Sequence, residues 1–125
     1  MIRSVYTRAG LDPSETDFVE AHGTGTLAGD PVEAGAISRV FGSDRPSDNP
    51  VRIGSVKTNV GHLEGASGVA GVVKAVLMLE NRMFLPNRNF EKINSRIPLD
   101  DWKLKVWILR QVENWRLTLV GSIVP

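Results

Sequence analysis

The two histidines of the chain each lie in a short, polar, glycine-rich segment. His22 lies in EAHGTGT, residues 20–26, and His62 lies in KTNVGHLEGA, residues 57–66. An imidazole near neutral pH can shuttle a proton, or donate a hydrogen bond to an oxygen that gains negative charge. Each segment follows a strand-like run and precedes a helix-like run, so we expect one site assembled from two loops.

Neighbouring residues add to this chemistry. Lys57, five residues before His62, can supply a positive charge that tunes the histidine. Thr24 and Thr26 offer hydroxyls that can hold a polar chain, and the glycines between them let a ligand approach the backbone closely. Taken singly, a loop histidine, a solvated lysine or a Gly-Thr turn has an ordinary structural explanation. Their coincidence at two matching junctions favours a functional site.

The surrounding pattern predicts the elements that position these loops. Residues 17–21 and 51–56 are short strand candidates that lead into the two histidine segments. Asp30 is interpreted as a helix N-cap, with Pro31 at the first helical position and Glu33 three residues after the cap. We therefore expect Asp30 and Glu33 to be capping residues rather than catalytic carboxylates.

Three helices are expected around the strands. One ends at Ala9 before Gly10, one runs from Pro31 to Phe41 and stops at Gly42, and one runs from Leu63 to Glu80 or Asn81. The third has small or apolar side chains on most of its faces, which predicts a buried helix. After Asn87 the chain looks irregular. Alternating strands and helices predict an α/β fold with a layered core.

Two other kinds of site fit these residues less well. The interval between Gly25 and Gly29 is one residue longer than in a dinucleotide-binding loop. Asp30 would also repel a pyrophosphate at the start of the helix. A metal site of His22, Asp30, Glu33 and His62 is chemically possible, but no HxxxH or HExxH spacing supports it. We therefore expect no metal and no directly bound cofactor.

Composition sets broader limits. The net charge is +1 and the basic residues are scattered, so no patch favours nucleic acid or an anionic membrane. The most apolar stretch, Ala66–Leu79, contains Lys74 and is too short to span a bilayer. No cysteine is present, which excludes disulfides and Cys-ligated zinc within the chain. A soluble, cytoplasmic protein is expected.

The two segments together resemble a known family. EAHGTGTLAGDPVE from Glu20 to Glu33 and KTNVGHLEGASG from Lys57 to Gly68 are similar to the two histidine motifs of β-ketoacyl synthases. The similarity is closest to the ketosynthase domain of type I polyketide synthases of the fungal reducing type. Flanking runs at 4–6, 9–13 and 96–102 agree, so the resemblance extends from Ile2 to about Val106.

The resemblance implies a partial thiolase-like fold, the C-terminal half of an αβαβα layered domain that is usually dimeric. It also implies decarboxylative Claisen condensation of malonyl, carried on the phosphopantetheine of an acyl carrier protein, with an acyl thioester. His22 and His62 would assist decarboxylation and stabilise the enolate oxygen, with Lys57 supporting His62. Thr24 and Thr26 would contact the pantetheine arm. Structural roles at the site are assigned to Asp30, Glu33, Asn59 and Gly61.

The chain also departs from the family pattern. The family's cysteine nucleophile lies upstream, in a segment that this chain does not contain, and the resemblance stops in the tail. We expect residues 1–106 to be a partial ketosynthase domain and 107–125 a divergent tail, for instance from a retained intron or a frameshift. The chain alone is then expected to be inactive and prone to association. The alternative is a non-catalytic module that binds a carrier protein or a complete ketosynthase.

Overall fold

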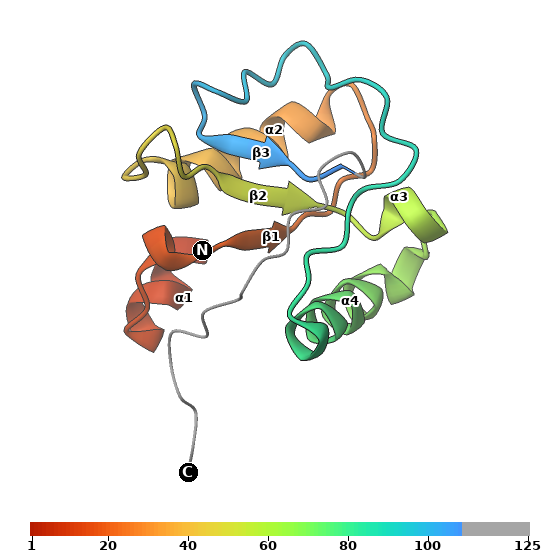
Figure 1. Ribbon diagram of the computed structural model, residues 1–125, viewed down its shortest axis with the longest axis horizontal. Coiled ribbons are helices and arrows are strands. Elements are labelled where there is room, and N and C mark those ends of the chain that lie inside the picture. The colour runs from red at the N-terminus through yellow and green to blue at the C-terminus, as the bar shows by residue number, and fades with distance from the viewer. Residues whose placement is uncertain (109–125) are drawn as a thin grey trace.

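The computed structural model describes residues 1–108, and these form one small parallel sheet with helices on both faces (Figure 1). The helices are α1 (Ile2–Ala9), α2 (Gly29–Ile37), α3 (Lys57–Val60) and α4 (Ser67–Asn81). The strands are β1 (Phe18–Glu20), β2 (Val51–Gly54) and β3 (Leu104–Val106). Short turns complete the order: 3-10 turns η1 (Pro13–Glu15) and η3 (Glu64–Ala66), and a π-helical turn η2 (Ser38–Gly42) that extends α2.

The sheet has the order β1-β2-β3 and both strand pairs are parallel. Val19 pairs with Ile53 and Val51 pairs with Leu104. Parallel neighbours need a crossover between them, which α2 supplies between β1 and β2. The predicted strands at 17–21 and 51–56 are confirmed in slightly shorter form. β3 is not among the predicted strands, because the sequence after Asn87 looks irregular and this strand has three residues.

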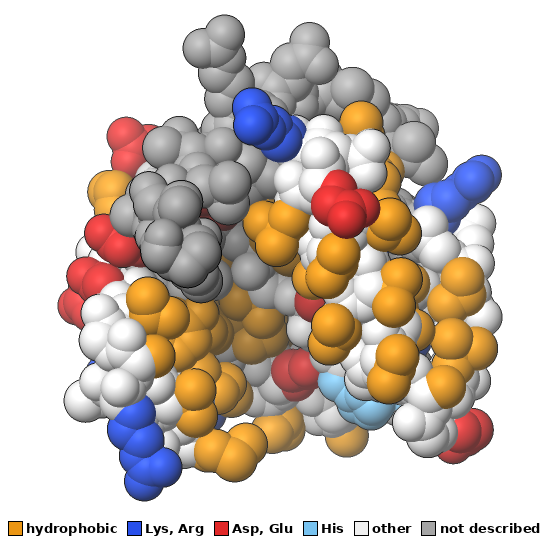
Figure 2. All heavy atoms as spheres, turned by 90° about the horizontal axis from the view of Figure 1, so that it is seen from below, with side chains coloured by type: hydrophobic (Ala, Val, Ile, Leu, Met, Phe, Trp, Pro, Cys, Tyr) orange, Lys and Arg blue, Asp and Glu red, His pale blue; other side chains and the backbone are white. Residues whose placement is uncertain are grey.

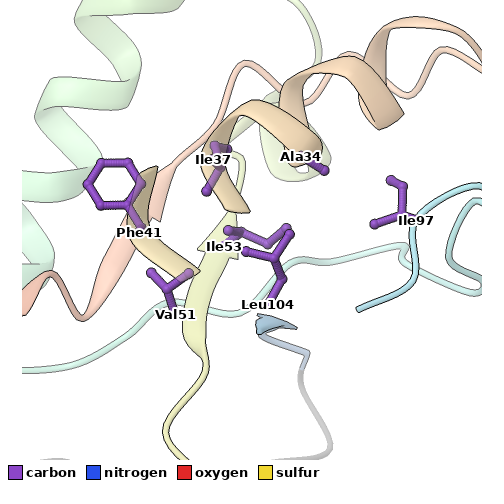
Figure 3. Close-up of a cluster of buried hydrophobic side chains, with 7 residues drawn as sticks. All are labelled: Ala34, Ile37, Phe41, Val51, Ile53, Ile97 and Leu104. Carbon is purple, nitrogen blue, oxygen red and sulfur yellow. The ribbon is translucent and has the colours of Figure 1, made fainter. Parts of the chain in front are cut away.

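The face of the sheet covered by α2 holds the main hydrophobic core (Figure 3). Its buried members come from α2, the π-helical turn, β2, β3 and the connection before β3: Ala34, Ile37, Phe41, Val51, Ile53, Ile97 and Leu104. Tyr6 of α1 meets the ring of Phe41 edge-on at 5.4 Å between centroids. The predicted stop at Gly10 is also confirmed, since Gly10 adopts the left-handed conformation (φ 66°) that ends α1.

The opposite face is covered by α4 and carries a smaller cluster of Met78, Phe84 and Trp107, with Phe18 packed against it. Arg52, which alternates with Val51 and Ile53 on β2, lies over the rings of Phe84 and Trp107 at 5.5 and 5.9 Å. Because successive strand residues point to opposite faces, β2 contributes to both layers. The described part therefore has three layers, α, β and α.

The prediction that α4 is a buried helix is wrong for most of its surface. Only Ser67, Lys74 and Met78 are buried. The exposed apolar residues of α4 are Val69, Val72, Val73, Val76, Leu77 and Leu79. Figure 2 shows hydrophobic side chains gathered over this helix, with histidine surface beside them. The physical reason is that the described residues include no second layer on that side of α4.

Within residues 1–108, no helix is long and apolar enough to cross a membrane. Residues 109–125 of the expected divergent tail lie outside the described residues.

Candidate functional site: a histidine pair at the end of the sheet

The two histidines meet at the carboxyl end of the sheet, beyond β1 and β2. Because these neighbouring strands are parallel, their carboxyl ends lie at the same edge, next to α3 (Figure 1). The ring centroids of His22 and His62 are 5.4 Å apart and the ring planes are inclined at 88°. The structure thus brings the two loops together, as the sequence predicts. The catalytic roles of the two residues stay a prediction.

The loop that carries His22 is held by two carboxylates of α2. Glu33 accepts the backbone N–H groups of His22 (2.6 Å) and Gly23 (2.9 Å). Asp30 accepts those of Gly25 (3.1 Å) and Thr26 (3.3 Å). Four of the five backbone N–H groups from His22 to Thr26 are thus oriented by charge-assisted hydrogen bonds, which are stronger than neutral ones.

The capping prediction for Asp30 and Glu33 is therefore wrong. Helix α2 begins at Gly29 with Ala28 as N-cap, so Asp30 lies inside the first turn. The Gly29 N–H is satisfied instead by Thr26 Oγ1 (3.0 Å). The loop folds back over the start of α2, and its N–H groups become the nearest partners for the carboxylates.

Gly23 lets the His22 loop lie directly on Ser55, the residue that follows β2. Its φ of +49° is in the left-handed region, and a Cβ there would lie 2.7 Å from Ser55 Cβ. Ser55 is buried and its hydroxyl donates to the His22 carbonyl (3.2 Å). A residue with a side chain at position 23 would have to push the loop away from β2.

His62 is held within its own turn. Its Nδ1 accepts the Glu64 N–H (3.0 Å) and lies 3.3 Å from Ser67 Oγ. A backbone N–H can only donate, so in this arrangement the neutral imidazole carries its proton on Nε2. A contact of 3.9 Å between Nδ1 and Glu64 Oε1 would require a protonated Nδ1. We assign the proton to Nε2, because the backbone hydrogen bond to Nδ1 is the shorter contact. The Glu64 side chain is 91% exposed, and ion pairs of such exposed groups contribute little.

The other predicted site residues lie in the same two loops. Lys57 begins α3 and is half-buried, and within residues 1–108 its ammonium makes no ion pair and no hydrogen bond to either imidazole. Asn59 Oδ1 accepts the Thr58 hydroxyl (2.9 Å). Gly61 ends α3 with φ 78° and ψ −173°, a conformation that favours glycine, and turns the chain into His62. Thr24 is exposed.

Three residues that support the loops were not singled out from the sequence. Asn87 Oδ1 accepts the Ser55 N–H (2.9 Å) and so fixes the end of β2. Glu20 and Lys74 form an ion pair of 2.7 Å with side chains 15% and 6% exposed. The signal for this pair was present, because a lysine within an apolar helix is almost never buried without a partner.

A cleft of about 700 Å³ lies behind the His22 loop, with Gly23, Ile53, Thr58 and Asn94 among its lining residues. Neither histidine lines it, so the cleft and the histidine pair are separate features. Across residues 1–108, no three His, Asp or Glu side chains are placed to hold a metal ion.

Comparison with known proteins identifies the family. The model of the β-ketoacyl synthase C-terminal domain matches residues 1–91. The chain is 65% identical over 115 residues to the highly reducing polyketide synthase phiA of a fungal species (Fungal sp.), covering 92% of this chain and 4% of that protein. It is 60% identical over 118 residues to the highly reducing polyketide synthase tstA of Talaromyces stipitatus, covering 94% and 4%.

Solved structures agree in fold. The oxazolomycin ketosynthase domain OzmH KS7 of Streptomyces albus superposes with a TM-score of 0.79 at 35% identity, over 86% of this chain and 19% of that one. The ketosynthase from module 1 of the bacillaene synthase of Bacillus amyloliquefaciens gives 0.78 at 36%, over 96% and 22%.

The chain belongs to the β-ketoacyl synthase family, of which it represents part of the C-terminal region. The relatives place it with the ketosynthase domains of polyketide synthases, and its fold is a partial thiolase-like α/β fold. Both predictions are confirmed. The chain spans about 4% of the length of the curated relatives it matches.

Proposed function

We propose that this chain supplies the two-histidine part of a ketosynthase site that decarboxylates a malonyl thioester and stabilises the resulting enolate. The observation that carries the proposal is the pair of imidazoles at 5.4 Å and 88° at the end of the sheet. The neutral His62 ring offers an Nε2–H donor, because Nδ1 already accepts the Glu64 N–H. Donors fixed in advance stabilise developing charge without the cost of reorganisation.

The proposed reaction begins with decarboxylation of the malonyl group. The bond between the malonyl carboxylate and its α-carbon breaks, carbon dioxide leaves, and the electron pair passes into the enolate of the thioester. The imidazole of His62 donates to the oxygen that gains charge, and His22 approaches the same region from a perpendicular plane. The α-carbon then attacks the carbonyl of an acyl thioester, and the thiolate that held the acyl group leaves.

The remaining assignments belong to the same proposal. Thr24 and Thr26 contact the phosphopantetheine arm of an acyl carrier protein, which delivers the malonyl group, and Lys57 supplies positive charge near His62. Residues 1–106 form the ketosynthase part, 107–125 form a divergent tail, and the enzyme acts in the cytoplasm as a homodimer. The 125 residues include no cysteine, so the acyl thioester is held elsewhere and this chain alone is expected not to condense substrates.

The test is the release of labelled carbon dioxide from malonyl-carrier protein by an intact polyketide synthase that contains this segment. His22→Ala or His62→Ala is expected to lower that rate about 100- to 1,000-fold, the usual cost of one oxyanion donor. Glu80→Ala on the exposed side of α4 is the control. Unchanged decarboxylation in both histidine variants would contradict the proposal.

A second candidate function, a non-catalytic association module, is favoured by the apolar face of α4. Val72 and Val76 are 64% and 46% exposed there, in a continuous stripe with their neighbours. Exposed apolar patches of this kind mark association surfaces. Sedimentation of the chain with a complete ketosynthase or with acyl carrier protein tests it, and Val72→Lys should abolish any complex. A chain that sediments as a monomer in both mixtures would exclude this role.

A further inference from the structure

We propose that the buried ion pair Glu20–Lys74 is a positioning device that fixes the separation of the two histidines. The inference rests on the proposed function for the meaning of the site, and on the geometry of the described residues for everything else. Glu20 is the last residue of β1, two positions before His22, and Lys74 lies on the helix that begins five residues after His62. The pair therefore joins the two chain segments that carry the imidazoles.

Glu20 uses both carboxylate oxygens across separate elements. Oε2 accepts the Lys74 ammonium at 2.7 Å, and Oε1 accepts the Val56 N–H at 2.5 Å. Val56 lies immediately before Lys57 and α3, which leads to His62. One carboxylate thus connects the end of β1, the turn after β2, and α4. No other ion pair within residues 1–108 joins residues so far apart in the chain.

The packing around the pair keeps α4 close. A Cβ at Gly71, three residues before Lys74, would lie 3.3 Å from Glu20 Cγ, so the backbone of α4 passes directly beside the carboxylate. The Lys74 ammonium also lies 5.2 Å from the ring centroid of Phe18, on the same face of β1 as Glu20. These contacts leave α4 little freedom to slide along the sheet.

Local contacts do not account for the position of His62. The hydrogen bonds of its imidazole stay within residues 62–67. They set the orientation of the ring relative to the start of α4, and they leave the placement of α4 on the sheet to other groups. A buried charge pair with good geometry is suited to that task, because a displaced helix would leave two charges without partners.

The experiment uses the full 125-residue chain labelled with 15N and 13C at histidine, so that every histidine signal comes from His22 or His62. The readouts are the ring chemical shifts, the cross-relaxation between the two rings and the melting temperature. Lys74→Met is expected to lower the melting temperature, shift both ring signals and weaken the cross-relaxation. Glu20→Gln keeps one acceptor oxygen but turns an NH2 donor toward the second donor, so it is expected to lower the melting temperature and to weaken the cross-relaxation as well.

The double variant Glu20→Gln/Lys74→Met separates positioning from the cost of an unpaired buried charge. It leaves no lone charge, so much of the lost melting temperature should return while the ring signals stay displaced. A return of the ring signals together with the melting temperature would overturn the proposal. The double variant also answers the question if Lys74→Met does not fold.

Arg45→Met is the matched control for loss of a buried cation. Arg45 and Lys74 are equally buried, each with 6% of its surface exposed. The guanidinium of Arg45 donates to the carbonyls of Phe41, Asn49 and Thr16, and none of these acceptors lies in either histidine segment. Its loss should lower the melting temperature without moving the ring signals. Equal ring shifts in Arg45→Met and Lys74→Met would overturn the proposal. Because these readouts require no turnover, their failure is distinguishable from failure of the decarboxylation test.

Discussion

The two histidine loops are held in different ways, although both are short, polar and rich in glycine. The His22 loop is anchored from outside, by the carboxylates of Asp30 and Glu33 on α2 and by the hydroxyl of Ser55 on the end of β2. The imidazole of His62 is anchored from within, by Glu64 and Ser67 of its own turn. The position of His22 therefore depends on α2 and on the end of the sheet, whereas the position of His62 depends on α4.

This difference indicates where the site is most easily lost. The His22 loop has four backbone donors tied to a helix whose Ala34 and Ile37 lie in the main core. The His62 turn depends on a helix that has three buried residues and a largely exposed apolar face. A substitution that loosens α4 should displace His62 more than His22. A substitution that removes the carboxylate of Asp30 or Glu33 should displace His22 more than His62.

The largest expected effect comes from removing the apolar anchor of α4. Met78→Ala should lower the free energy of unfolding by about 3 kcal/mol, since Met78 is 4% exposed and packs with Phe84 and Trp107. The His62 ring signal should shift more than that of His22. Urea unfolding and histidine NMR measure both. Val72→Ala, on the exposed side of the same helix, is the control, and an equal loss there would contradict the prediction.

Removing Glu33 tests the other loop. Glu33→Ala leaves the His22 and Gly23 N–H groups without their acceptor and should cost about 2 to 3 kcal/mol of unfolding free energy. The His22 ring signal should now move more than that of His62. The exposed Glu80→Ala should change the stability by less than about 0.5 kcal/mol. A larger shift at His62 than at His22 would refute the assignment.

Gly23→Ala tests the close approach of the His22 loop to β2. The new Cβ would collide with Ser55 at a φ that disfavours side chains, so we expect a loss of about 2 kcal/mol. Gly65→Ala is the matched control in the His62 segment, because no heavy atom lies within 4 Å of its Cβ position. Its effect should stay within about 1 kcal/mol. Thermal unfolding of the two variants compares the loops directly.

The smallest effect is expected at Ser67. Ser67→Ala removes the acceptor for the Leu63 N–H and a partner of His62 Nδ1, at a cost of about 1 kcal/mol. Only the His62 ring signal should shift. The exposed Ser43, whose hydroxyl donates to Asp44, provides the control variant Ser43→Ala. A shift of the His22 signal by Ser67→Ala would show that the two turns are coupled.

The sequence was sufficient to predict the family, the α/β class, the two leading strands and the meeting of the two histidines. These features follow from short-range patterns and from the rule that parallel strands end at one edge. The partners of Asp30 and Glu33 were not predictable in this way. Their carboxylates have the spacing of a capping box, and only the fold-back of the loop brings other donors closer.

The prediction that α4 is buried was wrong for a different reason. Apolar periodicity shows that a helix surface evolved for burial, but the partner that covers it need not lie within the described residues. Lys74 shows the reverse case, since its charge suggests exposure and yet it is 6% exposed against Glu20. Both cases show that a pattern describes one residue's preference, whereas burial depends on what is packed against it.

The strand order also has a kinetic consequence during synthesis. Phe18 pairs with Arg52 and Val51 with Leu104, so both ladders join residues that are far apart in the chain, and loop closure must precede any ladder bond. On the ribosome, β1 and β2 can pair while β3 has still to be made. Until Leu104 emerges, the other edge of β2 is open to strands of neighbouring nascent chains. The pace of translation between residues 55 and 103 therefore sets how long this edge is available for misassembly.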